Sequence, residues 1–398
     1  MKFNYEKLGN LIELSEQKNK DLAVKNLVGM NINKEFMPSV ANTVGTNLAR
    51  YKLIHKDQFA CNLMHVGRDK SVVVSLYSDI SPSIISPAYK IFQISNRNVL
   101  LPEFLMLYFL RNDFNRLGWF YTDSSIRGSL DWQKFCEIEV PIPNIEIQQK
   151  IVNIYNFLNK RISLKKEINK NLFNIASSLQ TDWMINFNPF KSKEFKSSSF
   201  GLIPEDWNVG KLGDVIELLD SKRIPLSGQE RENMEKIYPY YGAASLMDYV
   251  DDYIFEGIYL LMGEDGTVID EKGFPILQYV WGKFWVNNHA HILKGKNGFN
   301  VDSLYLLLSK TNIQSIVTGA VQAKVNQSNL KSIEIIIPPV EVMNEFNELI
   351  KPFFDAIRSN HDEIEKLQKL RDTLLPKLMS GEIDVSKINC DLNSYSKC

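Results

Sequence analysis

KLGNLIEL, the stretch from Lys7 to Leu14, recurs 204 positions later as KLGDVIEL, from Lys211 to Leu218, with six of its eight residues identical. Three more phrases recur in the same order. They are GRD and GED (67–69 and 263–265), LPEFLMLYFL and NVDSLYLLLS (101–110 and 300–309), and IEVPIPNIEI and IEIIIPPVEV (138–147 and 333–342). The offsets of 204, 196, 199 and 195 differ only by the few residues that loop insertions would add. Four matches in order indicate a tandem duplication, and this decides the architecture.

Each copy has the sequence pattern of a mixed domain of about 140 residues. Apolar segments such as SVVVSLY (71–77) and IYLLMG (258–263) are bounded by Gly, Asp, Asn and Pro, and they predict short strands. Segments 101–110 and 300–309 have an acidic residue at their third position and continue with mostly apolar residues, which predicts helices with an acidic first turn. We therefore expect the α+β class, with two mixed α/β domains in tandem.

A helical period follows each copy. Its apolar residues recur mostly at three- and four-residue steps, which predicts one long amphipathic helix after each domain. They are Ile151, Ile154, Leu158, Ile162, Ile168, Leu172, Ile175 and Leu179 in the first pattern, and Phe346, Ile350, Phe353, Ile357, Ile364, Leu367, Leu370, Leu374 and Leu378 in the second. Helices of about 50–60 Å, at 1.5 Å per residue, cannot bury such a stripe alone. We expect them to pair as an antiparallel coiled coil, with a pseudo-twofold relation between the domains. Pro352 and Pro376 predict a kink or a break in the second helix, and Gly381 predicts its end.

These patterns divide the chain into five segments. They are a first domain (1–143), a central helical spacer and linker (144–196), a second domain (197–339), a C-terminal helical spacer (340–385) and a polar tail (386–398).

Composition excludes several classes of protein. Apolar residues make up 44% and charged residues 23%, as in a soluble globular chain, and no run of 18 apolar residues predicts a membrane span. No signal peptide is evident, so we expect a cytoplasmic protein. The four cysteines, Cys61, Cys136, Cys390 and Cys398, are too scattered to predict a zinc site or a disulfide framework.

Charge is unevenly distributed along the chain. Residues 1–200 hold 26 Lys and Arg against 18 Asp and Glu, whereas residues 201–398 hold 20 against 29, for a net charge of −1. A protein that grips DNA alone normally carries a stronger basic field. If this chain binds DNA, we expect it to share the phosphate backbone with a partner.

Three constellations suggest catalysis, and each is incomplete. Asp265, Asp270 and Lys272 loosely resemble a nuclease metal site, but VIDEKGFP (268–275) is more typical of a charged turn between strands. NFNPF (186–190) resembles the tetrapeptide of amino-methyltransferases, but it lacks the second proline and a Gly-rich cofactor loop. The spacing of His289 and His291 would place both on one side of a strand, and two histidines without a third ligand favour polar packing or a DNA-facing surface over a metal site.

What remains is binding through loops that combine basic, aromatic and small residues. The segments are ARYK (49–52), GRDK (67–70), SSIRGS (124–129), KRIPLSGQERE (222–232), YPYYGAAS (238–245) and AVQAKVNQSN (320–329). SSIRGS and AVQAKVNQSN occupy equivalent places in the two copies, before the matched Ile-Glu strands. Arg, Gln and Asn can bond base edges, and Ser, Lys and Tyr can hold phosphates. The candidate DNA-binding residues are Arg50, Tyr51, Arg68, Lys70, Ser125, Arg127, Lys222, Arg223, Tyr240, Tyr241, Gln322, Lys324 and Gln327. For any one of them an ordinary polar loop remains the alternative.

At this point the sequence resembles the specificity subunits of type I restriction-modification systems. The residues that carry the likeness are SSLQTDWMINFNPFKSKEF (177–195), GLIPEDWNVGKLGDVIEL (201–218), YYGAAS (240–245), LMGEDGTV (261–268) and EKLQKLRDTLLPKLMSGEIDV (365–385). The resemblance covers nearly the whole chain. The first copy departs from the pattern because it lacks a GxIPxxW lead-in and begins at NYEKLGN (4–10).

The resemblance implies two target recognition domains, 1–143 and about 197–339, each recognising one half of a split site in double-stranded DNA, with the helices fixing the gap between the halves. It also implies two modification subunits, which carry S-adenosylmethionine and methylate adenine N6, and restriction subunits that use ATP. No cofactor or metal is expected on this chain, because S-adenosylmethionine, ATP and Mg would belong to the partners. Two other hypotheses stay open. One is a stand-alone metal-dependent nuclease that uses Asp265, Asp270 and Lys272, and the other is a helical scaffold or decoy that binds modification subunits without sequence preference.

Overall fold

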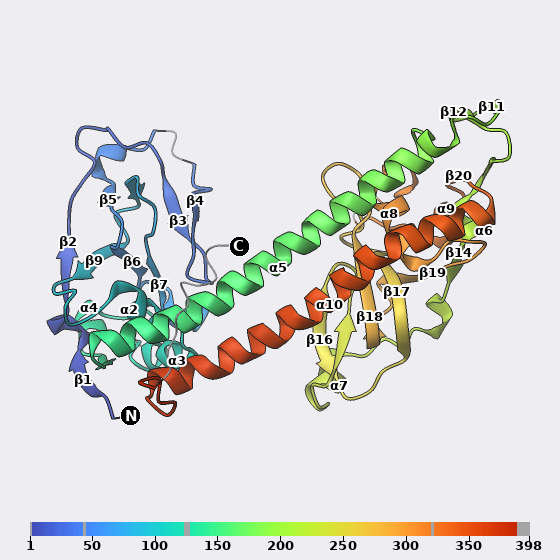
Figure 1. The fold of residues 1–398 in the computed structure, drawn as a ribbon. Helices are drawn as coiled ribbons and strands as arrows, with labels where there is room; N and C mark the ends of the chain where they lie inside the picture. Colours follow the sequence, from blue (N-terminus) through green and yellow to red (C-terminus); the bar gives the residue numbers. More distant parts are fainter. Residues whose placement is uncertain (1, 43–44, 123–127, 320–321, 388–398) are drawn as a thin grey trace. The chain divides into compact units, whose positions relative to one another are not determined.

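The computed structural model describes residues 2–42, 45–122, 128–319 and 322–387. The chain divides into two compact units. Unit 1 comprises residues 1–164 and 363–398, and unit 2 comprises residues 165–362. Two helices of 40 residues, α5 (Ile145–Met184) and α10 (Val340–Met379), each contribute one part to unit 1 and the other to unit 2 (Figure 1).

Unit 1 contains a four-stranded antiparallel sheet in the order β2-β9-β6-β7, with three two-stranded pairs, β1-β10, β3-β4 and β5-β8. Its strands are β1 (Asn4–Lys7), β2 (Ile12–Ser15), β3 (Val28–Met30), β4 (Phe36–Pro38), β5 (Lys52–Ile54), β6 (Phe59–Asn62), β7 (Val73–Leu76), β8 (Ser83–Ile85), β9 (Lys90–Ile94) and β10 (Glu139–Ile142). Its helices before α5 are η1 (Leu8–Asn10), η2 (Leu48–Arg50), α1 (Val66–Asp69), α2 (Pro102–Phe109), α3 (Asn112–Phe120) and α4 (Trp132–Cys136).

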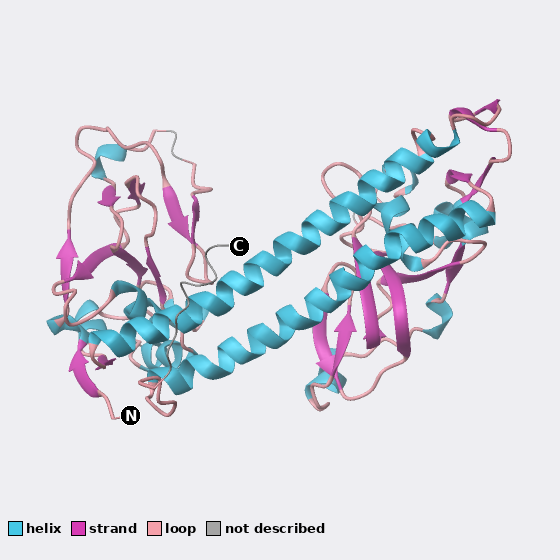
Figure 2. Cartoon of the chain, in the orientation of Figure 1, coloured by secondary structure: helices cyan, strands magenta, loops and turns pink. Residues whose placement is uncertain are grey.

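Unit 2 contains a six-stranded sheet in the order β14-β19-β17-β18-β15-β16, in which only β15 and β18 run parallel, and the pairs β11-β12 and β13-β20 (Figure 2). Its strands are β11 (Phe195–Ser198), β12 (Gly201–Pro204), β13 (Asn208–Lys211), β14 (Ile216–Leu218), β15 (Tyr238–Tyr241), β16 (Leu246–Val250), β17 (Phe255–Gly263), β18 (Leu277–Val286), β19 (Ala290–Gly295) and β20 (Glu334–Ile337). Its shorter helices are η3 (Asn188–Phe190), α6 (Leu212–Val215), η4 (Asp220–Lys222), α7 (Gly228–Glu232), α8 (Val301–Ser309), η5 (Gln314–Ile316) and α9 (Gln327–Lys331).

Strand register confirms the duplication. In unit 1 the strand that leads into the first matched phrase, β1, pairs with the strand of the last phrase, β10, and Lys7 lies opposite Glu139. In unit 2 strand β13 pairs with β20 in the same way, and Lys211 lies opposite Glu334. The two phrases that recur most clearly in the sequence are therefore neighbours in each domain.

The central strands repeat as well. Leu14 and Phe59 both pair with Phe92 in unit 1, whereas Leu218 and Leu260 both pair with Leu293 in unit 2. The prediction of two mixed α/β domains in the α+β class is thereby confirmed.

Gly9 and Gly213 lie in the short helical turns η1 and α6, where close packing requires glycine. Neither has a positive φ. A Cβ on Gly9 would lie 2.9 Å from the Cβ of Cys136, at the end of α4, and a Cβ on Gly213 would lie 3.0 Å from the Cβ of Lys331, at the end of α9. Glycine is needed because another helix approaches the backbone closely.

The long helices run antiparallel within each unit. In unit 1 Arg161 forms an ion pair with Glu363, and Arg371 donates to Asn159 at 3.0 Å. In unit 2 Asn169 donates to the Ile357 carbonyl at 3.1 Å and accepts a bond from Asn360 at 2.9 Å. The pseudo-twofold relation between the domains stays a prediction. None of the described helices has the length and apolar character that a membrane span requires.

The predicted break in the second helix is wrong, because α10 continues through Pro352 and Pro376. Both prolines are exposed, so the carbonyl groups that lose their partners can face water. An interior proline costs about 3 kcal/mol, whereas burying Phe346, Ile350 and Phe354 contributes about 1.5–3 kcal/mol for each side chain. The burial therefore outweighs the cost at Pro352. The helix ends at Met379, and Gly381 then takes a φ of 75°, as predicted.

Candidate nucleic-acid interface

Two loops of unit 1 meet at a pair of glycines. The Gly67 N–H donates to the Gly128 carbonyl at 2.8 Å, and the Leu130 N–H donates to the Leu63 carbonyl at 2.9 Å. A Cβ on Gly67 would lie 2.7 Å from the Cα of Gly128, so the approach requires glycine. The loop that carries GRDK thus rests against the end of the SSIRGS segment.

The same pair of loops occurs in unit 2. The Gly266 N–H donates to the Ala323 carbonyl at 2.9 Å, and the Val325 N–H donates to the Glu264 carbonyl at 2.8 Å. Thr318 and Lys324 exchange two backbone hydrogen bonds of 2.8 Å and close a hairpin. We call the described residues of this segment, 318–319 and 322–325, the unit 2 hairpin. The described ends of the two segments, 128–129 of SSIRGS and 322–329 of AVQAKVNQSN, thus follow equivalent backbone contacts, and the other residues of both segments lie outside the described residues.

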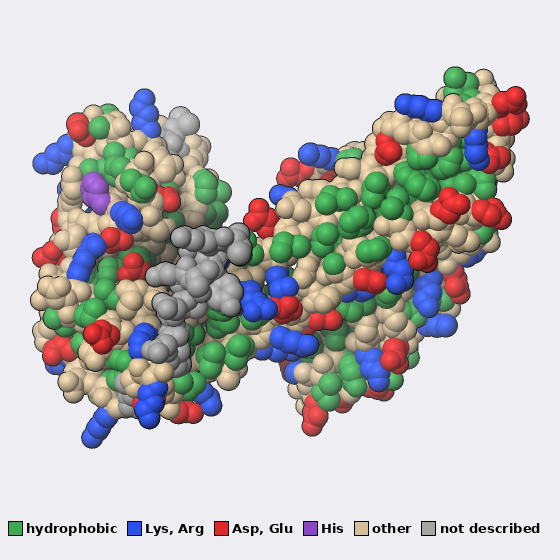
Figure 3. All heavy atoms as spheres, in the orientation of Figure 1, with side chains coloured by type: hydrophobic (Ala, Val, Ile, Leu, Met, Phe, Trp, Pro, Cys, Tyr) green, Lys and Arg blue, Asp and Glu red, His purple; other side chains and the backbone are tan. Residues whose placement is uncertain are grey.

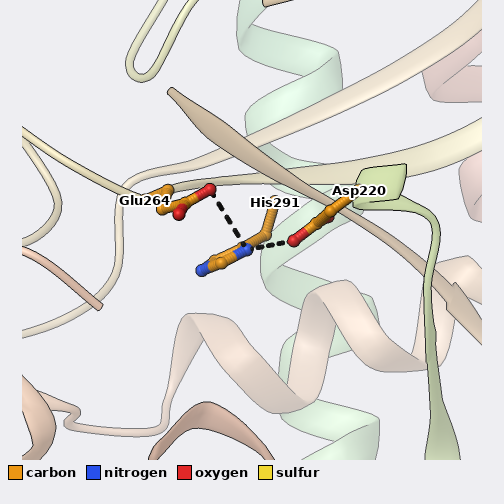
Figure 4. A group of neighbouring side chains, drawn as sticks. All are labelled: Asp220, Glu264 and His291. Atoms are coloured by element: carbon orange, nitrogen blue, oxygen red, sulfur yellow. Dashed lines mark hydrogen bonds and ion pairs between the residues drawn. The ribbon is translucent and has the colours of Figure 1, made fainter. Parts of the chain in front are cut away.

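A buried charged cluster lies beneath the loops of unit 2 (Figure 4). His291, on β19, is 0% exposed, and Asp220, at the start of η4, is 6% exposed. Nδ1 of His291 lies 2.6 Å from Oδ2 of Asp220 and 3.7 Å from Oε2 of Glu264. Nε2 lies 2.7 Å from the carbonyl oxygen of Val325, in the unit 2 hairpin. The imidazole therefore joins residues that are far apart in the sequence.

The partners of His291 assign its protons. A carbonyl oxygen only accepts, so Nε2 donates to Val325. Burial raises the pKa of Asp220, but hydrogen bonds from the His291 ring and the Ile292 N–H, with positive charges nearby, bring that pKa below its ordinary value. The ionised carboxylate also only accepts, so Nδ1 donates as well. By this assignment from hydrogen-bond partners, the ring is an imidazolium.

Arg223 completes the cluster. Its guanidinium donates to Oε2 of Glu264 at 2.6 Å, to the Ala290 carbonyl at 2.7 Å and to the Asp220 carbonyl at 3.0 Å. Nζ of Lys324 lies 3.5 Å from Oε1 of the same glutamate. Two carboxylates therefore face three cationic side chains.

Asp220, Glu264 and His291 offer ligand atoms within 4.8 Å of one another, which is close enough to hold a metal ion. However, the glutamate oxygen in that set already accepts from Arg223, and His291 uses both nitrogens as donors. A metal ion would need a free imidazole lone pair and would lie beside a guanidinium. The cluster fits a hydrogen-bonded charge network better than a metal centre.

The structure brings several predicted residues of unit 2 together around this cluster. Arg223 and Lys324 bond Glu264, and Gln327 donates to Asp220 at 2.6 Å. Lys222 is exposed at the end of η4, and Gln322 is exposed in the unit 2 hairpin. Arg223 has a side chain only 13% exposed and is committed to intramolecular bonds, so its surface for DNA is small.

The two predicted tyrosines lie elsewhere. Tyr240 is 1% exposed, accepts a hydrogen bond from the Leu226 N–H at 3.1 Å and carries Arg231 over its ring. Tyr241 packs edge-on against Phe284. Tyr240 is thus a core residue that offers almost no surface to DNA.

In unit 1 the predicted residues form two separate groups. Arg50 and Tyr51 lie at the end of η2, whereas Arg68 and Lys70 lie on α1 and its C-cap. Among the described residues, no hydrogen bond or ion pair joins the two groups. Arg68 bonds its neighbour Asp69 at 2.7 and 3.1 Å, and the hydrogen bond from Arg68 lowers the pKa of that carboxyl. Ser125 and Arg127 lie outside the described residues.

Sequence reasoning missed an aromatic cluster beside Lys70. Trp119, Phe120 and Tyr121 end α3 and are 48%, 79% and 39% exposed. Nζ of Lys70 lies 5.5 Å from the centre of the Trp119 ring. Tyr121 also lines a hollow of about 590 Å³ with Met64, Ser129, Trp132, Lys90 and Lys134. Three successive aromatic residues, two positions before SSIRGS, were the signal that could have revealed this surface.

The structure separates the two histidines that the spacing placed on one face. The side chain of His289 is 47% exposed and bonds Asp265 at 2.5 Å, whereas His291 is fully buried. Strand β19 begins at Ala290, so strand alternation does not extend to His289. Polar packing is the correct interpretation for His291.

The nuclease residues form a turn. Asp270 accepts the backbone N–H groups of Lys272 and Phe274, each at 2.9 Å, and its own N–H donates to the Phe274 carbonyl. The carboxylate thereby caps a tight turn, as VIDEKGFP predicts. The geometry favours this role over metal binding.

Comparisons with known proteins agree on one family. The model of the type I restriction modification DNA specificity domain matches residues 2–174 and 204–369. The type I restriction enzyme MjaIX specificity subunit of Methanocaldococcus jannaschii is 29% identical over 272 residues, which are 63% of this chain and 62% of that protein. The match therefore spans less than two thirds of that relative.

Other relatives cover different shares. A putative specificity subunit of Haemophilus influenzae, S.HindORF215P, is 34% identical over 139 residues, 35% of each chain. The HindI specificity subunit of the same organism is 21% identical over 83% of this chain and 88% of its own. The crystal structure of a type I S subunit from M. genitalium aligns with a TM-score of 0.56 at 14% identity, over 95% of this chain and 96% of that one, which shows a shared fold.

Proposed function

Since the chain belongs to the family of type I restriction modification DNA specificity proteins, we propose that it is the non-catalytic DNA-recognition subunit of a type I restriction-modification complex. The observation that supports this most is the pair of equivalent loops in each unit, closed by Gly67–Gly128 in one and Gly266–Ala323 in the other. Two copies of one loop arrangement suit a site with two parts.

Each unit recognises one half of a bipartite DNA site in this proposal. The loops share backbone contacts but the exposed side chains around them differ, since unit 1 presents Arg68 and Lys70 at α1 and Phe120 on α3, whereas unit 2 presents Lys324 and Gln322 on its hairpin. Basic and amide side chains hold phosphates and bond base edges, and aromatic side chains stack on bases or wedge between them. Different side chains on one scaffold would select different half-sites.

The partners are two modification subunits and, through them, restriction subunits. One face of α5 supports this docking, because Ile168 and Ile175, both in unit 2, are each nearly half exposed at helical spacing. Figure 3 shows hydrophobic side chains gathered along the long helices of unit 2. S-adenosylmethionine, ATP and Mg belong to those partners in this scheme, and the complex acts on cytoplasmic DNA.

Co-expression with the modification subunit tests the function. Methylome sequencing of the host should reveal methylated adenines in a bipartite motif. Exchange of residues 1–143 for the corresponding domain of another specificity subunit should change one half of the motif and leave the other unchanged. An unaltered motif would refute the proposal, and DNA binding without sequence preference would favour a scaffold or decoy.

A further inference from the structure

Three segments of unit 2 converge on the imidazole of His291. Asp220 belongs to the turn that carries Lys222 and Arg223, Glu264 belongs to the loop after β17, and Val325 belongs to the unit 2 hairpin. Gln327 adds a bond from the residues after the hairpin to Asp220. These segments also carry most of the candidate DNA-binding residues of the unit.

The two bonds of His291 are directional. Nδ1 donates to Asp220 at 2.6 Å, and Nε2 donates to Val325 at 2.7 Å. A rigid ring that donates on opposite sides fixes the separation between the η4 turn and the hairpin. Loss of the bond to Val325 would leave that buried carbonyl without this donor, which is costly, whereas Asp220 would keep the bond from Gln327.

Unit 1 contains a related arrangement at the corresponding place. Asp220 lies two residues beyond KLGDVIEL, and Glu16 lies two residues beyond KLGNLIEL. Glu16 accepts from the buried Lys52 at 3.1 Å, and Lys52 also donates to the Tyr89 carbonyl at 3.0 Å. In both units an acidic side chain after the first matched phrase binds a buried cation that also holds a backbone carbonyl. The cation differs, because His291 comes from β19 and Lys52 from β5.

We propose that His291 is a positioning residue for recognition of the second half-site, holding the unit 2 hairpin at a fixed distance from the Lys222–Arg223 turn. The inference rests on the proposed function. His291 is fully buried, so it does not contact DNA. It acts through Lys222, Gln322 and Lys324, which are exposed on the segments that it joins.

The test compares three variants in the assembled complex with the modification subunits. His291→Gln can donate to Val325 but then turns its amide oxygen towards Asp220, where two acceptors face each other. The double variant Asp220→Asn/His291→Gln restores complementary pairs, because the new amide donates one hydrogen to the glutamine at position 291 and the other to Gln327, whose amide flips to present its oxygen. His289→Gln, on the exposed neighbouring histidine, is the control.

Binding is measured on three duplexes: the cognate site, a site substituted in the first half and a site substituted in the second half. His291→Gln should lower discrimination at the second half by about 10-fold and leave discrimination at the first half unchanged. The double variant should recover most of the loss, and His289→Gln should behave as the unmodified chain does.

The outcomes separate this inference from the proposed function. If the unmodified complex shows no preference for either half, the proposed function fails. If it discriminates and a folded His291→Gln variant discriminates equally well, only the positioning role fails. Equal losses at both halves, or a double variant that does not fold, would also overturn that role, because they would show a general structural requirement.

Discussion

At Gly9 and Gly213 the opening phrase of each domain touches a helix from later in the same domain. A Cβ would lie 2.9 Å from Cys136 or 3.0 Å from Lys331, closer than side chains normally pack. Gly9→Ala or Gly213→Ala should lower the free energy of unfolding by about 1–3 kcal/mol, because the added methyl group overpacks the contact. Alanine also favours a helix over glycine by about 1 kcal/mol, which offsets part of that loss.

Urea denaturation measures the effect, with Gly29→Ala as a matched control because nothing lies within 4 Å of a Cβ there. If the alanine variants at positions 9 and 29 unfold at the same urea concentration, close approach is not the reason for glycine.

Lys34 should give unit 1 a pH-dependent stability. Its Nζ is buried, donates to the Phe109 carbonyl and to Asn115, and has its pKa lowered by burial to about 7. In the unfolded chain the pKa of a lysine is about 10.4. Between these pH values the unfolded state binds more protons than the folded state. The free energy of unfolding should therefore rise with pH from about 7 to about 10 and be lowest below pH 7.

Lys34→Met should abolish this rise, as measured by urea unfolding at several pH values from 7 to 10. The exposed Lys25→Met is the control and should keep the slope of the unmodified chain. A slope that persists in Lys34→Met would assign the effect to another group.

At the scale of the element, polar side chains fix the register of the paired helices in unit 2. Asn360 donates to Asn169, which itself donates to the Ile357 carbonyl. Asn360→Leu should cost about 1–3 kcal/mol, because it removes the donor to Oδ1 of Asn169 in a half-buried seam. Asn169→Leu/Asn360→Leu should recover stability, since two apolar side chains can pack there, at the expense of a less specific register.

A double-mutant cycle from urea unfolding gives the coupling energy of the pair, and the exposed Asn174→Leu provides the baseline. If the changes in the free energy of unfolding of the two single variants add up to that of the double variant, the two amides do not interact.

At the scale of the whole molecule, the two recognition surfaces should contribute independently. Phe120 is 79% exposed in unit 1, and Lys324 has a side chain 49% exposed in unit 2. Phe120→Ala should weaken binding through the first half-site and Lys324→Ala through the second. Because the sites share no partner, the double variant should show the sum of the two losses in binding free energy to within about 0.5 kcal/mol.

Titrations of cognate duplex into the assembled complex test this, with the exposed Phe200→Ala as control. A coupling well above that limit would mean that the two units recognise DNA as one surface.

The sequence by itself determined the duplication, the strand and helix types and the two long helices. These features depend on local periodicity and on phrases that recur in order, and the strand register then paired the same phrases in both units. The prediction of a break at Pro352 was wrong, because local helix propensity takes no account of the burial of the side chains around the proline. Burial is a property of the packed unit.

Only the tertiary structure decided what each candidate side chain does. Tyr240 is a core residue, and Arg223 bonds Glu264 inside the unit. His291 is buried, whereas its neighbour His289 is exposed. Asp220 and His291 are 71 residues apart, and neither has a local pattern that predicts the other. Sequence spacing constrains neighbours along one element, whereas charge pairing and desolvation depend on which distant segments fold against each other.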